Sequence, residues 1–233
     1  MSPPLLLIVL ALAAFLSGSI PFGYVIGRTR GVDIRQHGSR NIGATNVGRV
    51  LGRPWGFLCF GLDLLKGLLP TLGAGAALGV LGSAAPPAGL AWAWLGVMAA
   101  SVLGHMFSPW VGFKGGKGVA TGFGALLGVW PLLTLPAVVA LGVWLATLAA
   151  TRYVGLSSCL AATSLPASVL AAPVALAAVG LAEAQPGGAG TPWPHLIVAT
   201  VLGGLVVYKH RGNLARVWAG TEPKVGRGAR AGR

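Results

Sequence analysis

The longest apolar block of the chain is VATGFGALLGVWPLLTLPAVVALGVWLATLAA, residues 119–150. A single α-helix of these 32 residues would be about 48 Å long, well beyond the roughly 30 Å of a bilayer's hydrocarbon core. Pro131 and Pro136 stand near the middle of the stretch, and proline ends or bends a helix. The stretch is therefore predicted to cross the membrane twice or to fold back as a shallow hairpin.

The rest of the chain also has the composition of a polytopic membrane protein. Of its 233 residues, 55% are hydrophobic and 9% are charged, whereas soluble domains are about a quarter charged. Apolar residues form blocks of about spanning length, which predicts helices rather than barrel strands. Six blocks can be read, at residues 5–26, 55–81, 90–107, 119–150, 153–181 and 194–208.

Basic residues are distributed unevenly among the connections. They occur in residues 28–53, at Lys114 and Lys117, at Arg152, and in the tail from Lys209. The connections 82–89 and 182–193 contain no Lys or Arg. Since cytoplasmic loops carry the excess of these residues, seven crossings with the N-terminus outside and the C-terminus inside are expected. The predicted fold class is an all-α membrane helix bundle, a single domain over residues 1–233 with a basic, flexible tail from about 217 to 233.

The formal net charge of +13 raises the question of nucleic-acid binding. Membrane orientation and anionic lipid account for these basic residues, so no nucleic-acid partner is expected. Cys59 and Cys159 both lie within apolar blocks and are too few for a disulfide framework or a zinc site. The four acidic residues form no cluster that could hold a metal ion. We therefore expect neither a metal nor a cofactor.

Three polar clusters stand at predicted cytoplasmic ends. The first comprises residues 17–23, SGSIPFG, followed by residues 38–49, GSRNIGATNVGR. Its glycines let backbone N–H groups approach an oxyanion, and arginine presents a bidentate fork to phosphate. The alternative interpretation is a glycine-rich surface turn whose arginines only orient the protein in the membrane.

The second cluster is residues 112–121, GFKGGKGVAT, which leads directly into an apolar block. A glycine-rich turn at a helix N-terminus, with a lysine beside it, is typical of an anion site. It is not a Walker A loop, because Val111 occupies the position of the first glycine and Gly118 follows Lys117. The alternative is a flexible loop with two lysines that set membrane orientation.

The third cluster, residues 207–216, follows the last apolar block, with Glu222 a little beyond it. Its His, Asn and Arg side chains could orient a polyhydroxy substrate and bind its charge. A basic flank that stops membrane transfer is the alternative. A transporter for an anionic phosphorylated solute is the second function considered. It needs polar residues along a path through the membrane, whereas these clusters lie on one face.

Two further polar positions lie within the apolar blocks. Asp63 and Lys66 are three residues apart on one helix face, and buried charges cost roughly 3 kcal/mol each at membrane depth, so a structural ion pair is expected. His105 lies at the inner end of the third block, where it either lines a pocket formed by these clusters or caps its helix. His195 is predicted to lie at the outer face and to take no part.

Together, four segments resemble the motifs of the PlsY-type glycerol-3-phosphate acyltransferases of bacteria. They are residues 18–21, 38–46, 104–105 with 113–121, and 210–213, in the order in which the family has them. The resemblance implies a seven-helix fold and direct acyl transfer from acyl phosphate to the 1-hydroxyl of sn-glycerol 3-phosphate. The implied products are lysophosphatidic acid and phosphate, in the first acylation step of phospholipid synthesis.

The resemblance also implies a location and partners. The protein would lie in the bacterial inner membrane with its active site facing the cytoplasm. It would bind acyl phosphate, glycerol 3-phosphate and membrane lipid, and would make transient contact with the soluble enzyme that produces acyl phosphate.

Site residues carry over from the same motifs. Ser39, Arg49 and Lys117 would hold phosphate, and His210 and Asn213 would orient glycerol phosphate. Asn41 and Asn46 would support the first loop. The remaining substrate-binding candidates are Gly115, Gly116, Gly118, Thr121, Arg211, Ser158 and His105. One departure is that Gly155 replaces the first serine of a Ser-x-x-Ser pattern that ends at Ser158.

Overall fold

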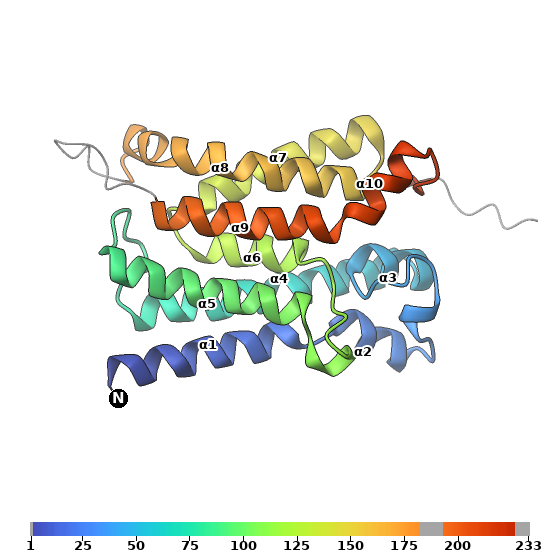
Figure 1. Ribbon diagram of the computed structural model, residues 1–233, viewed down its shortest axis with the longest axis horizontal. Helices are drawn as coiled ribbons and strands as arrows, with labels where there is room; N and C mark the ends of the chain where they lie inside the picture. The colour runs from blue at the N-terminus through green and yellow to red at the C-terminus, as the bar shows by residue number, and fades with distance from the viewer. Residues whose placement is uncertain (1, 182–192, 227–233) are drawn as a thin grey trace, which may run out of the picture.

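The computed structural model describes residues 2–181 and 193–226, which form a bundle of α-helices. Figure 1 shows the long helices side by side, with α2, α3 and α10 gathered at one end and the N-terminus at the other. The α-helices are α1 (Pro3–Ser19), α2 (Phe22–Thr29), α3 (Ala44–Leu51), α4 (Arg53–Ala77), α5 (Ala88–Met106), α6 (Val119–Gly128), α7 (Thr134–Thr151), α8 (Val154–Ala178), α9 (Trp193–Lys209) and α10 (Arg211–Trp218). Two 3-10 helices are η1 (Ile34–Gln36) and η2 (Pro109–Val111).

Five segments of the described chain are long and apolar enough to cross a membrane. They are Pro3–Thr29, Arg53–Ala77, Ala88–Val111, Thr134–Thr151 and Val154–Ala178, and α6 and α9 are shorter apolar helices. The polytopic, all-helical prediction is thus confirmed, while the count of seven crossings stays a prediction. The connection 182–192, expected outside, lies beyond the described residues.

The stretch 119–150 folds back as its prolines predicted. α6 ends at Gly128 and α7 begins at Thr134, with Pro131 in the turn between them. The two halves are unequal, because α7 has 18 residues whereas α6 has only 10, about 15 Å of helix. α6 is therefore shorter than the hydrocarbon core is thick, and it packs inside the bundle against α4.

The first apolar block is one span but not one continuous helix, which corrects the expectation of a single transmembrane helix over residues 5–26. α1 ends at Ser19 and α2 begins at Phe22, because Pro21 has no N–H to continue the ladder. Two side chains that are distant in sequence, Ser108 after α5 and Lys66 of α4, donate hydrogen bonds to the freed carbonyls. Ser108 Oγ donates to Ser19 O at 2.6 Å, and Lys66 Nζ donates to Ile20 O at 2.6 Å.

The main core cluster draws buried side chains from α1 and from α4 to α9. Trp94 is fully buried and its indole N–H donates to Thr71 O at 2.8 Å, which ties α5 to α4. A Cβ on Gly67 of α4 would lie 2.1 Å from Thr121 O of α6, so glycine is required for this close helix contact. The outer side of α1 instead exposes Leu5, Ile8, Leu12 and Leu16, a helical stripe suited to lipid.

Candidate active site

The glycine loop, residues 112–118, lies against the C-terminal end of α5. Gly116 donates its backbone N–H to His105 O at 3.1 Å. A Cβ on Gly116 would lie 2.1 Å from His105 Nε2, so a larger residue would displace the loop or the imidazole. Gly118, with φ of +79°, precedes the first residue of α6. The loop thus ends at a helix N-terminus, where unpaired N–H groups and the helix dipole favour an anion.

Lys117 links this loop to α10. Its Nζ donates a hydrogen bond to Asn213 Oδ1, although the two residues are 96 positions apart. Burial lowers the pKa of Lys117 to about 8, because the surroundings disfavour the ammonium form. Lys114, three residues earlier, is exposed. The two lysines of the loop therefore have different environments, and only Lys117 belongs to the cluster.

Asn213 is held on its other side by a carboxylate. Its Nδ2 donates to Glu222 Oε1 at 2.6 Å, and Arg216 Nε donates to Glu222 Oε2 at 2.7 Å. Glu222 is only 6% exposed. The chain from Lys117 to Arg216 thus alternates donors and acceptors, which fixes the orientation of the Asn213 amide.

The segment after α10 closes over this network. Pro223 O accepts a hydrogen bond from an Arg49 guanidinium N–H at 3.3 Å, and Val225 N donates to Arg152 O at 2.9 Å. Residues 219–226 of the predicted tail therefore lie against the body of the protein. Residues 227–233 are outside the described part of the chain.

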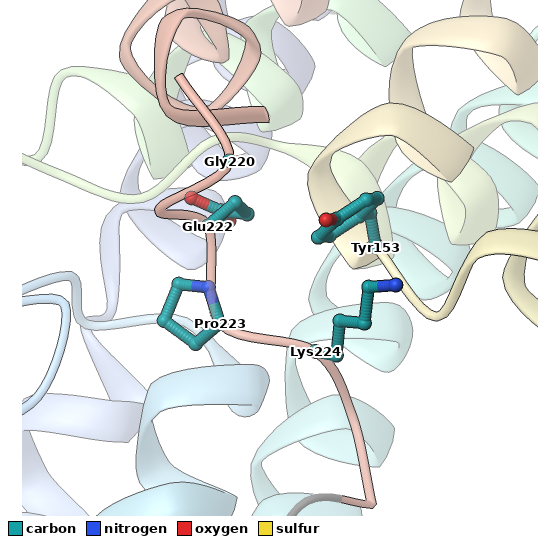
Figure 2. Close-up of a pocket in the computed structure, with 5 residues that line it drawn as sticks. All are labelled: Tyr153, Gly220, Glu222, Pro223 and Lys224. Carbon is teal, nitrogen blue, oxygen red and sulfur yellow. The ribbon is translucent and has the colours of Figure 1, made fainter. Parts of the chain in front are cut away.

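A pocket of about 280 Å³ opens beside Glu222. Figure 2 shows Glu222 and Pro223 on one side of it and Tyr153, which precedes α8, on the other. The Lys224 ammonium lies 5.1 Å from the centre of the Tyr153 ring. The pocket thus places an aromatic ring and an ammonium group next to the polar network.

On the α3 side, two asparagines shape the loop before the helix. Asn46 is buried, and its Nδ2 contacts Ile34 O, His37 O and Asn41 O at 2.9–3.2 Å. Its Oδ1 accepts the Ser39 N–H at 2.8 Å, and Asn41 Oδ1 accepts the Gly43 N–H at 2.9 Å. Both amides therefore bond the loop itself, and they leave Ser39 exposed at its surface.

His210 and Arg211 differ in accessibility. His210 is 3% exposed, and its Nδ1 lies 2.8 Å from Val206 O. Burial lowers the pKa of His210 to about 4, so the imidazole is neutral near pH 7, with Nδ1–H on Val206 O and Nε2 as an acceptor. Arg211 is exposed, donates to Tyr208 O at 3.0 Å and stacks on the Tyr208 ring.

Three further predicted residues are buried. Ser158 Oγ donates to Val154 O and accepts the Trp144 indole N–H at 3.2 Å, which directs it to α7. Thr121 is fully buried, and its hydroxyl has no hydrogen-bond partner among the described residues. His105 lies beneath the glycine loop at 4% exposure.

The sequence matches a known protein family. Residues 8–220 match the model of the glycerol-3-phosphate acyltransferase family. The chain belongs to this family. A glycerol-3-phosphate acyltransferase of Aquifex aeolicus is 39% identical over 91% of this chain and 96% of its own length. One from Trichlorobacter lovleyi is 41% identical over 91% and 93%.

Two solved structures of a member of this family resemble the chain in fold. The glycerol 3-phosphate form of PlsY (YgiH), an integral membrane glycerol 3-phosphate acyltransferase, superposes with a TM-score of 0.75 at 38% identity, covering 94% of this chain and 96% of that one. A lysophosphatidic acid form of PlsY gives a TM-score of 0.73. This chain is therefore an integral membrane acyltransferase of glycerol 3-phosphate, and it serves phospholipid synthesis.

Two residues of the network, Arg216 and Glu222, were not predicted as site residues from the sequence. Both are polar residues in an otherwise apolar chain, and Glu222 is one of only four acids. That scarcity was an available signal. Their convergence depends on the turn at Gly220, with φ of +69°, which brings Glu222 back to Asn213.

Proposed function

We propose that the chain transfers an acyl group from acyl phosphate to the 1-hydroxyl of sn-glycerol 3-phosphate. The products are lysophosphatidic acid and inorganic phosphate. The contact of Lys117 with Asn213 carries this proposal, because it joins the glycine loop to the segment expected to orient glycerol phosphate. Family membership supports the acceptor, and the donor is our own assignment.

Cationic and N–H groups near this contact suit two phosphate-bearing substrates. Lys117 and the loop N–H groups at the start of α6 offer one anion site. Arg216 and Arg49 flank the Glu222 network, because Arg216 donates to Glu222 and Arg49 donates to Pro223 O. Ser39 is exposed on the neighbouring loop, where its hydroxyl is free to approach a ligand. We assign phosphate binding to Ser39, Arg49 and Lys117.

His210 and Asn213 are assigned to the glycerol moiety. The neutral His210 imidazole donates from Nδ1 to Val206 O, which leaves its Nε2 lone pair for a substrate hydroxyl hydrogen. The Asn213 amide is fixed between Lys117 and Glu222. A rigid pair of polar groups can hold the acceptor hydroxyl near a bound acyl carbonyl, and such positioning lowers the barrier to transfer.

The reaction needs no covalent enzyme intermediate. The 1-hydroxyl oxygen bonds to the carbonyl carbon of acyl phosphate, and the bond from that carbon to the phosphate oxygen breaks. The electron pair leaves with phosphate, and the hydroxyl proton is released to phosphate or water. Lys117 and the loop N–H groups stabilise the negative charge that develops during transfer.

We also propose the orientation and surroundings of the site. Seven crossings, with the N-terminus outside, would put α2, α3 and α10 at the cytoplasmic face of the bacterial inner membrane. The excess of Lys and Arg near these elements supports this orientation. Acyl phosphate would arrive from the soluble enzyme that makes it, through a transient contact at the same face.

The donor can be tested directly. Purified protein in detergent is given glycerol 3-phosphate with either acyl phosphate or acyl-coenzyme A, and lysophosphatidic acid and phosphate are measured. We expect phosphate release equal to product formed with acyl phosphate, and no comparable turnover with the thioester. Equal or faster turnover with acyl-coenzyme A would contradict the donor assignment and leave the acceptor untouched.

A further inference from the structure

A buried polar network lies between α4 and the glycine loop. Asp63 and Lys66 form an ion pair of 2.7 Å, with both side chains only 3% exposed. Lys66 Nζ also donates to Ile20 O at the break between α1 and α2. The His105 imidazole faces the pair, with its Nδ1 3.7 Å from Asp63 Oδ1. Groups from α1, α4 and α5 thus meet around one carboxylate.

His105 connects this carboxylate to the loop. Its carbonyl accepts the Gly116 N–H at 3.1 Å, and its Nε2 lies under the Gly116 Cα, where a Cβ would come within 2.1 Å. Among residues 2–181 and 193–226, Nδ1 has no hydrogen-bond partner, and the carboxylate it faces is that of Asp63. The charge on Asp63 therefore favours the ring orientation that supports Gly116, the residue next to Lys117.

We propose that Asp63 is a positioning residue for acyl transfer: through His105 it holds Gly116, and thereby Lys117, where the lysine reaches Asn213. The inference rests on the proposed function and deepens it. Asp63 itself does not touch substrate. The competing explanation is that the ion pair with Lys66 serves only insertion and folding, as the sequence alone predicted.

The decisive variant is the double substitution Asp63→Asn with Lys66→Met. Replacing a buried ion pair by neutral groups of similar volume is often neutral, whereas Asp63→Asn alone would leave a buried ammonium without its partner. The double variant also loses the hydrogen bond from Lys66 to Ile20 O, and the melting temperature reports that loss. Thr71→Val is the matched control, because Thr71 is equally buried on α4, two turns further from the loop, and its hydroxyl bonds only Gly67 O.

Three measurements separate positioning from folding. They are the KM for each substrate, the melting temperature in detergent, and the mobility of a spin label on a cysteine at position 114, where Lys114 is exposed. We expect the double variant to raise the KM for glycerol 3-phosphate by about tenfold, equivalent to 1.4 kcal/mol. The KM for the acyl donor should change much less, and the label should become more mobile. Thr71→Val should match the wild type in all three.

Two results would overturn the positioning role. One is an unchanged KM and label spectrum in the folded double variant. The other is a lower melting temperature together with a lower kcat and an unchanged KM for each substrate, which is the signature of a purely structural pair. If the wild type itself failed to acylate glycerol 3-phosphate, the proposed function would fail instead, and the label spectra alone would decide the positioning.

Discussion

Replacing Lys117 by alanine removes the ammonium group that joins the glycine loop to α10. The group is half-buried and donates to Asn213, which leaves it beside the anion site at the start of α6. A charge-assisted hydrogen bond contributes about 1.5 to 3 kcal/mol, and one that stabilises developing charge about 2 to 4 kcal/mol. The expected loss in kcat/KM is therefore roughly thirty- to a thousand-fold.

Lys114→Ala is the matched control, because Lys114 belongs to the same loop and is exposed. A solvent-exposed charge contributes at most about 1 kcal/mol, so this variant should lose less than about fivefold. Both proteins are purified, checked by thermal melting, and assayed for phosphate release. Neither substitution removes a packed core side chain, so both should fold. Equally mild effects in folded protein would make the loop a charged connector, and the phosphate site would then have to be sought around Arg49 and Arg211.

Three other outcomes are expected. The KM for glycerol 3-phosphate should rise as pH increases through about 8, because Lys117 loses its proton there, whereas Lys117→Arg should keep a flat profile since guanidinium stays charged; identical profiles would argue against Lys117 as the anion ligand. Gly116→Ala should reduce kcat/KM by about tenfold or more through its clash with the ring beneath it, whereas Gly122→Ala, where a Cβ meets no atom within 4 Å, should be neutral. A cysteine at Ala85 should react with an impermeant reagent on intact cells, and one at Lys114 only after permeabilisation; the reverse pattern would invert the proposed orientation.

Helix lengths and loop charges carried most of the fold prediction. Residues 119–150 are too long for one span and contain two prolines, so their turn could be predicted from length and proline position. The break at Pro21 was harder to see, because apolar residues continue on both sides. It is stabilised by Ser108 and Lys66, which are distant in sequence, and hydropathy contains no information on such caps.

Loops of distinctive composition indicated which segments of the chain lie together. The glycine loop and the segment after α9 do meet, through Lys117 and Asn213. Sequence composition was less informative for residues within apolar helices. Thr121 and Ser158 lie on helices that are apolar all round, so no pattern indicates which side faces the site, and packing directs them into the bundle instead.

The buried charges of α4 have a consequence for how the protein is made. α4 is the least apolar of the five candidate spans, since it carries Asp63 and Lys66 in its middle. The carbonyl of Ile20, which accepts the hydrogen bond from Lys66, belongs to a span that leaves the ribosome before α4. α1 can therefore already be in the bilayer when α4 emerges, ready to accept a hydrogen bond that an isolated α4 would lack. A circular permutation that places α1 after α4 would deprive α4 of this acceptor during insertion, even though every contact of the finished bundle could still form.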